Sequence, residues 1–296
     1  MTAGWVAGTV RARAMARRTL GAEAARQVAA SRSLPAGQRM LQSTYFRDAA
    51  KTGLSLEMAQ HVVAATILWD LRVLAGWLPR DGVSLLRLLA GWFEIANVEE
   101  LLQAQAGLPA GPQFQLGALA MAWPRLSGAR STVELRRALA ASAWGDPGGD
   151  TSRDIRLAMR ARWAARVAGS GDRPRTWATT AAAMLRSQAP SAVGTVGAGD
   201  RADADRGSAA VAPLAGPGRP RASVASAGRP AQPGAEAAWW RRVESDGRVL
   251  LRSAATDSGP VLGAVALMAA DARRVRAALA SAARGGHALG SYDALV

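Results

Sequence analysis

Residues 68–107 constrain the fold more than any other stretch of the chain, because they form two long runs with helical periodicity. Apolar side chains recur at spacings of three and four on both sides of the break at residues 79–82. Proline ends a helix that runs into it, so we expect the first helix to stop at Pro79, and Asp81 or Ser84 to cap the second. The stretch therefore predicts a helical hairpin in a helical core.

The rest of the chain adds helical patterns and no convincing pair of strands, so the predicted fold class is all-α. Residues 2–30 predict one helix or a helix pair. Its expected apolar side is Val6, Val10, Ala14 and Met15. Tyr45, Phe46, Trp239 and Trp240 are expected to pack in the interior. Further helices are expected over residues 38–50, 116–122, 132–143, 152–168, 176–187, 237–252 and 261–283.

Residues 190–235 differ in composition from the rest, since they are built mainly of Ala, Gly, Pro, Ser and Arg with no aromatic side chain. Such a segment buries too little apolar surface to offset its backbone entropy. We therefore expect a long disordered insertion between N-terminal and middle helical lobes (residues 1–189) and a C-terminal helical lobe (residues 236–296). Its glycines lack the preceding strand and following helix of a phosphate-binding loop.

No motif indicates catalysis. The absence of cysteine excludes disulfides and thiolate metal sites, and His61 and His287 lack the partner spacing of a zinc site. Lys51, the only lysine, follows no glycine-rich loop, and no serine lies on a Gly-x-Ser-x-Gly elbow. Glu94, Glu99 and Glu100 offer paired carboxylates without an implied cleft. We expect no active site, cofactor or metal, and a helical enzyme without a recognisable motif remains a minor hypothesis.

The net charge of +15 indicates an anionic partner without choosing among acidic proteins, anionic lipid and nucleic acid. Residues 1–47 carry eight arginines and one glutamate, whereas residues 48–120 are net acidic. A basic helical nucleic-acid-binding protein is therefore the alternative function. No signal peptide is expected near the N-terminus, and no apolar run is long enough to predict a membrane span.

Residues 85–107 resemble a recurring helix of the C (also called d) subunit of V/A-type rotary ATPases. That helix carries an acidic residue, Asn three positions later, apolar residues and a closing glycine. The matching positions are Glu94, Asn97, Val98, Leu102 and Gly107. Gln103 and Gln105 depart from the family, which tends to place basic residues there.

The C-terminal residues 259–285 are similar to the closing helix of the same family, and residues 4–13 fit its opening helix. The two long segments also align with each other, with Asn97 opposite Arg274 and Leu102 opposite Leu279. The resemblance covers residues 4–125 and 238–290. The short middle region and the low-complexity insertion depart from the family pattern, as in a divergent member.

The resemblance implies three similar helical lobes that form a funnel. It also implies a non-catalytic subunit, without cofactor or metal, that seats the central rotor shaft on the membrane rotor ring of an ion-translocating ATPase. The subunit would be cytoplasmic and peripheral to the inner face of the cell membrane. The residues expected at its subunit contacts are Arg11, Arg13, Arg17, Arg18, Glu94, Asn97, Glu99 and Glu100.

Overall fold

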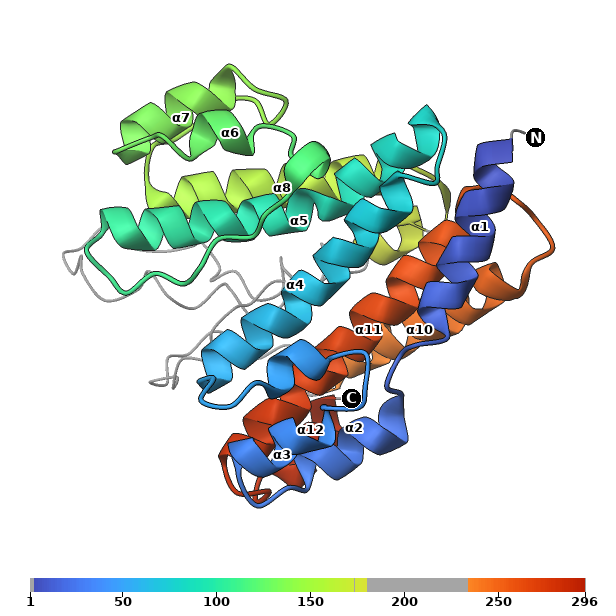
Figure 1. The fold of residues 1–296 in the computed structure, drawn as a ribbon. Helices are drawn as coiled ribbons and strands as arrows, with labels where there is room; N and C mark the ends of the chain where they lie inside the picture. The colour runs from blue at the N-terminus through green and yellow to red at the C-terminus, as the bar shows by residue number, and fades with distance from the viewer. Residues whose placement is uncertain (1–2, 173, 180–233, 296) are drawn as a thin grey trace.

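The computed structural model describes residues 3–172, 174–179 and 234–295, and this part of the chain is all-α, as the sequence predicts (Figure 1). The expected disordered insertion lies outside the described residues, apart from residues 234 and 235. The described elements are α1 (Ala3–Ala16), α2 (Ala22–Ala29), α3 (Leu34–Met40), η1 (Arg47–Ala50), α4 (Leu56–Ala75), α5 (Arg80–Gln105), η2 (Gly117–Leu119), α6 (Trp123–Leu126), α7 (Thr132–Ala140), α8 (Ser152–Gly169), α10 (Ala235–Arg252), α11 (Ser258–Ala283) and α12 (Leu289–Leu295).

The predicted central hairpin is present as α4 and α5, but its turn differs from the expectation. Helix α4 ends at Ala75, and Pro79 occupies the N-cap position of α5 without a side-chain cap. The expectation that Asp81 or Ser84 caps the second helix is wrong, because α5 already begins at Arg80. Proline suits this position, since it has no backbone N–H that would need a partner at a helix start.

Helix α1 buries the opposite side from the one that the sequence pattern predicts. Val6 and Val10 are 44% and 61% exposed, and Ala14 is also exposed, whereas Met15 is buried as expected. The buried side consists of Gly8, Thr9, Ala12, Met15 and Ala16. A Cβ atom at Gly8 would lie 2.2 Å from Cδ2 of Leu78, so the absence of a side chain allows α1 to approach the turn after α4.

The remaining helix predictions divide into correct and incorrect ones. Helices α7, α8, α10 and α11 confirm those expected over residues 132–143, 152–168, 237–252 and 261–283. The helix expected over residues 38–50 is instead the shorter α3, capped by Ser33, and the separate turn η1. Residues 116–122 form only the turn η2. Residues 174–179 are helical, and the rest of the helix expected there lies outside the described residues.

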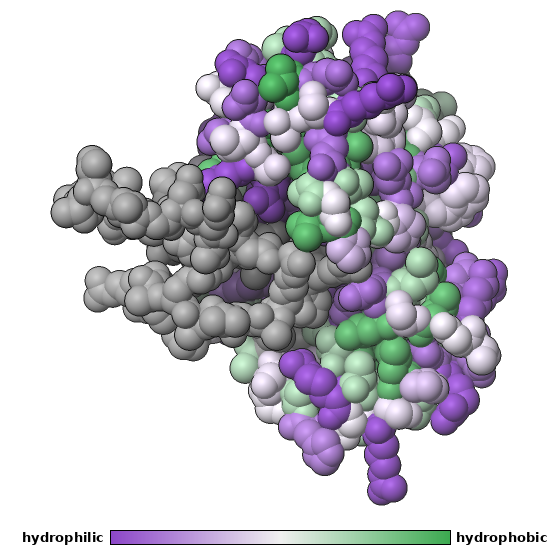
Figure 2. All heavy atoms as spheres, turned by 90° about the vertical axis from the view of Figure 1, so that its left-hand side faces the viewer, coloured by the Kyte–Doolittle hydropathy of each residue, from purple (hydrophilic) through white to green (hydrophobic). Residues whose placement is uncertain are grey.

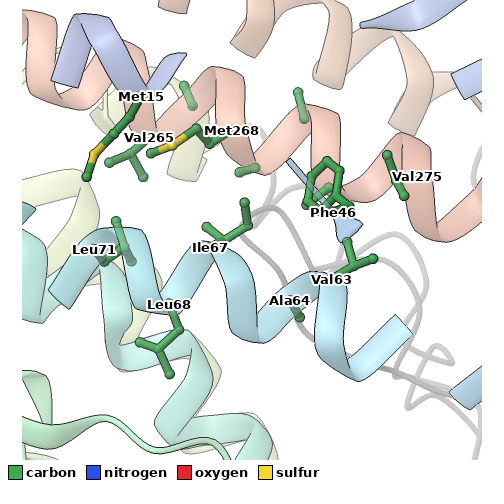
Figure 3. Packing of buried hydrophobic residues seen from close by; sticks show 14 of the residues in the cluster. Met15, Phe46, Val63, Ala64, Ile67, Leu68, Leu71, Val265, Met268 and Val275 are labelled. Carbon is green, nitrogen blue, oxygen red and sulfur yellow. The ribbon is translucent and has the colours of Figure 1, made fainter. Parts of the chain in front are cut away.

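The described helices pack around two clusters of buried apolar side chains. The larger cluster joins α1–α4 to α10 and α11, and it includes the predicted packing aromatics Phe46, Trp239 and Trp240, while Tyr45 packs against it partly buried. Figure 3 shows Ile67 and Leu71 of α4 facing Val265 and Met268 of α11. The smaller cluster lies among α5–α8. Helix α5 contributes to both, so one helix connects the two clusters.

Helices α10 and α11 approach each other closely at two glycines. A Cβ atom at Gly263 of α11 would lie 2.6 Å from the carbonyl oxygen of Gly247 and 2.9 Å from the amide nitrogen of Leu251, both on α10. These atoms are backbone, which cannot move without displacing the helix. Both helices also contribute side chains to the larger cluster, so the C-terminal residues share this core with α1–α4.

We predict that Gly263→Ala lowers the free energy of unfolding by about 1–3 kcal/mol, because the added methyl group forces α10 and α11 apart. Denaturant unfolding of the full chain measures this effect. Gly169→Ala is the matched control, since a Cβ atom added at this position on α8 would meet no atom within 4 Å. We expect this control to be neutral or stabilising by about 0.5 kcal/mol. Equal stability of both variants would contradict the close approach.

Candidate functional site

Glu94 of α5 lies fully buried and holds the segment before α6. Its carboxylate accepts hydrogen bonds from the backbone N–H groups of Met121 (2.7 Å) and Ala122 (2.8 Å). The indole Nε1 of Trp144 donates a third hydrogen bond at 2.6 Å. The carboxylate thus fixes the loop that leads into α6 and the segment after α7.

Asp271 of α11 makes the same kind of contact with the segment before α2. Its side chain is buried, and its two oxygens accept hydrogen bonds from the backbone N–H groups of Leu20 (2.7 Å) and Gly21 (2.8 Å). Burial raises the pKa of Asp271, and the two backbone donors oppose that rise. We call this arrangement, a buried carboxylate on a long helix that accepts two consecutive backbone N–H groups, a carboxylate clamp.

The two carboxylate clamps are formed by residues that align with each other in the sequence. The sequence offset that pairs Asn97 with Arg274 and Leu102 with Leu279 also pairs Glu94 with Asp271. Helices α5 and α11 have the same length of 26 residues, and each is the second helix of a hairpin, after α4 and α10 respectively. Each hairpin therefore has a buried carboxylate near the middle of its second helix, 14 residues after the start of α5 and 13 residues after the start of α11.

The other polar residues expected at a contact surface on α5 mainly bond within the chain. Asn97 is fully buried; its amide donates to the carbonyl oxygen of Phe114 (2.9 Å) and accepts from the N–H of Phe114 (2.6 Å). Glu99 pairs with Arg160 of α8, and burial raises the pKa of Glu99. Glu100 accepts a hydrogen bond from the N–H of Gly111. Glu94 and Asn97 therefore belong to the interior and not to a surface that a partner contacts.

The four arginines expected at a contact surface on α1 divide into two pairs. Arg13 donates to the carbonyl oxygens of Leu251 (3.1 Å) and Ser253 (2.5 Å), so it secures α1 to the end of α10. Arg18 lies 3.4 Å from the carboxylate of Asp70 on α4. The remaining two are exposed, Arg11 on α1 and Arg17 in the turn directly after it.

Asp70 is a structural residue that sequence reasoning did not single out. The carboxylate is nearly buried and accepts a hydrogen bond from the hydroxyl of Tyr45, while Arg18 lies 5.0 Å from the centre of the Tyr45 ring. Burial raises the pKa of Asp70, whereas Tyr45, Arg18 and Arg11 lower it. An acidic residue within an apolar helical run was the available signal, since such a residue needs a partner when it is buried.

The described residues contain no group of three or more His, Cys, Asp or Glu side chains arranged to hold a metal ion. Among the described helices, none combines the length and hydropathy needed to cross a bilayer. Neither a protein-family model nor a curated protein matches this chain.

We predict that Asp271→Ala lowers the free energy of unfolding by about 2–3 kcal/mol, because the N–H groups of Leu20 and Gly21 lose their acceptor inside the structure. Glu94→Ala is expected to have an effect of the same size. Asp172→Ala is the control, since the Asp172 side chain is 96% exposed, and its effect is expected to stay within about 0.5 kcal/mol. Urea unfolding compares the three variants, and equal values for all of them would contradict the role of the clamps.

The raised pKa of Asp271 predicts a specific pH dependence. The folded chain holds this proton more tightly than the unfolded chain, whose Asp has a pKa of about 3.9. The contribution of Asp271 to stability is therefore largest below that value and decreases as the pH rises through the raised pKa of the folded state. We expect the stability of the wild type relative to Asp271→Asn to fall as the pH rises from about 4, measured by denaturant unfolding across a pH series.

Proposed function

We propose that the chain is a non-catalytic coupling subunit of a V/A-type rotary ATPase. In this role it seats the rotating central shaft on the membrane rotor ring, on the cytoplasmic side of the cell membrane, and takes part in ion transport without performing chemistry itself. Its partners are the shaft subunits and the rotor ring.

The observation that carries this proposal is the repeated hairpin with a carboxylate clamp. The residues that resemble the C subunit lie on α5 and α11, and a family of similar helical lobes implies internal repetition of this kind. Glu94 and Asp271 are aligned in the two segments, and each accepts hydrogen bonds from two consecutive backbone N–H groups, Glu94 from the segment before α6 and Asp271 from the segment before α2. The sequence resemblance and the repeated geometry therefore support the same proposal.

The proposed contact surface is the outer side of α1. Val6, Val10 and Arg11 are exposed on this helix, and Arg17 is exposed in the turn directly after it. A surface with exposed apolar residues and guanidinium groups suits a partner with apolar and acidic side chains. Arg13 and Arg18 support this surface indirectly, because they attach α1 to α10 and α4.

Purification of the tagged chain from detergent-solubilised membranes of its own host tests the proposed function. We expect shaft subunits and the membrane sector of a rotary ATPase to co-purify. Loss of the chain is expected to abolish ATP-driven ion transport while ATP hydrolysis persists. Recovery without any ATPase subunit would contradict the proposal. Retention on DNA that falls steeply between about 50 and 200 mM salt would favour the alternative of nucleic-acid binding.

We predict that the double substitution Arg11→Glu and Arg17→Glu reduces co-purification of the shaft subunits by at least about tenfold, because it reverses the charge of the α1 surface. The control carries the same charge change at Arg125 of α6 and Arg137 of α7, which are both exposed. Quantitative mass spectrometry of the purified complex measures the ratio. Equal loss in both double variants would show a general charge effect and reject the α1 surface.

A further inference from the structure

Helix α4 carries an exposed tryptophan that neither the core nor the proposed coupling role uses. Trp69 is 58% exposed, whereas most large apolar side chains of α4 are buried. Val6 and Val10 of α1 are also exposed, one helical turn apart, and the face in Figure 2 shows hydrophobic patches between hydrophilic side chains. A solvent-exposed tryptophan loses hydrophobic free energy that a partner would recover, and tryptophan is enriched at the energetic centres of interfaces.

Trp69 lies within a strip of apolar residues along the outer side of α4. The neighbours at helical spacing are half-buried: Met58, Val62, Ala65 and Val73. Of these, Val62, Ala65 and Val73 pack against the larger cluster. From Met58 to Val73 the strip extends about 22 Å along the helix axis at 1.5 Å per residue. The strip therefore has the length and direction of a helix-packing seam.

Both borders of the strip are basic. On one side, Arg72 lies 5.3 Å from the centre of the Trp69 ring and donates to the carbonyl oxygen of Gln115 (3.3 Å). On the side of Asp70, the half-exposed Arg18 lies 3.4 Å from the Asp70 carboxylate. Near Trp69, two guanidinium groups therefore lie beside one carboxylate that is nearly buried, whereas Glu57 is exposed at the start of the strip. The electrostatic potential along the strip favours acidic side chains.

We propose that the outer side of α4 is a docking surface for an amphipathic helix of another protein, with an apolar stripe along Trp69 and acidic residues on its flanks. The apolar strip matches the stripe of such a helix, and the arginines on both borders match its acidic flanks. This surface is argued from α4 and its neighbours alone and does not rest on the proposed coupling role.

The test measures binding of the full chain to two labelled helical peptides of about 16 residues, which match the length of the strip. Both carry the same leucine stripe; one has glutamates on its flanks and the other has lysines. Fluorescence anisotropy gives the dissociation constants. We expect the glutamate peptide to bind at least about tenfold more tightly than the lysine peptide, with an affinity that falls as salt is added.

Trp69→Ala is expected to weaken binding of the glutamate peptide by at least about tenfold. Leu157→Ala is the control, because Leu157 is 49% exposed on α8 and lies outside the strip. Thermal unfolding checks that both variants fold, and the comparison of the two peptides on the wild type needs no variant. Absent binding, equal affinity for the two peptides, or an unchanged affinity in Trp69→Ala would overturn the proposal. Trp69-dependent binding to phosphatidylglycerol vesicles without peptide binding would also overturn it, in favour of a lipid surface.

Discussion

The structure depends on two buried carboxylates, each of which holds the backbone N–H groups of a distant segment. Asp271 joins α11 to the start of α2, which lies 250 residues earlier in the chain. Glu94 joins α5 to the segment before α6 and to Trp144. A carboxylate that accepts several hydrogen bonds tolerates burial, whereas its removal leaves donors without partners. These contacts hold the segments before α2 and α6 against α11 and α5.

The long helices provide the frame on which these contacts act. Helix α5 contributes side chains to both apolar clusters, so close packing on two of its sides fixes its position. The close approach of Gly247 and Gly263 fixes α10 on α11 in a similar way. A frame of this kind suits the proposed role, in which a subunit transmits force by mechanical fit and performs no chemistry.

Packing also determines which of the N-terminal arginines bond within the chain and which stay exposed. Arg13 and Arg18 became parts of the contacts that hold α1, whereas Arg11 and Arg17 remained exposed. Their sequence spacing does not distinguish the two pairs, because α1 has apolar residues on more than one side. The contact with Leu78 determines which side of α1 is buried, because the side that carries Gly8 fits against that turn. On α4, packing likewise leaves Trp69 exposed, whereas Leu68 and Leu71 beside it are buried.

The sequence by itself determined the fold class, the central hairpin and the positions of the other long helices, because helical periodicity and proline breaks are local properties of the chain. It also indicated the internal repetition through the alignment of α5 with α11. Only the tertiary structure decided that Glu94 and Asn97 lie inside, that α1 buries its glycine side, and that Asp271 forms a clamp. These outcomes depend on contacts between residues far apart in sequence, and local patterns do not specify which helix face meets which neighbour.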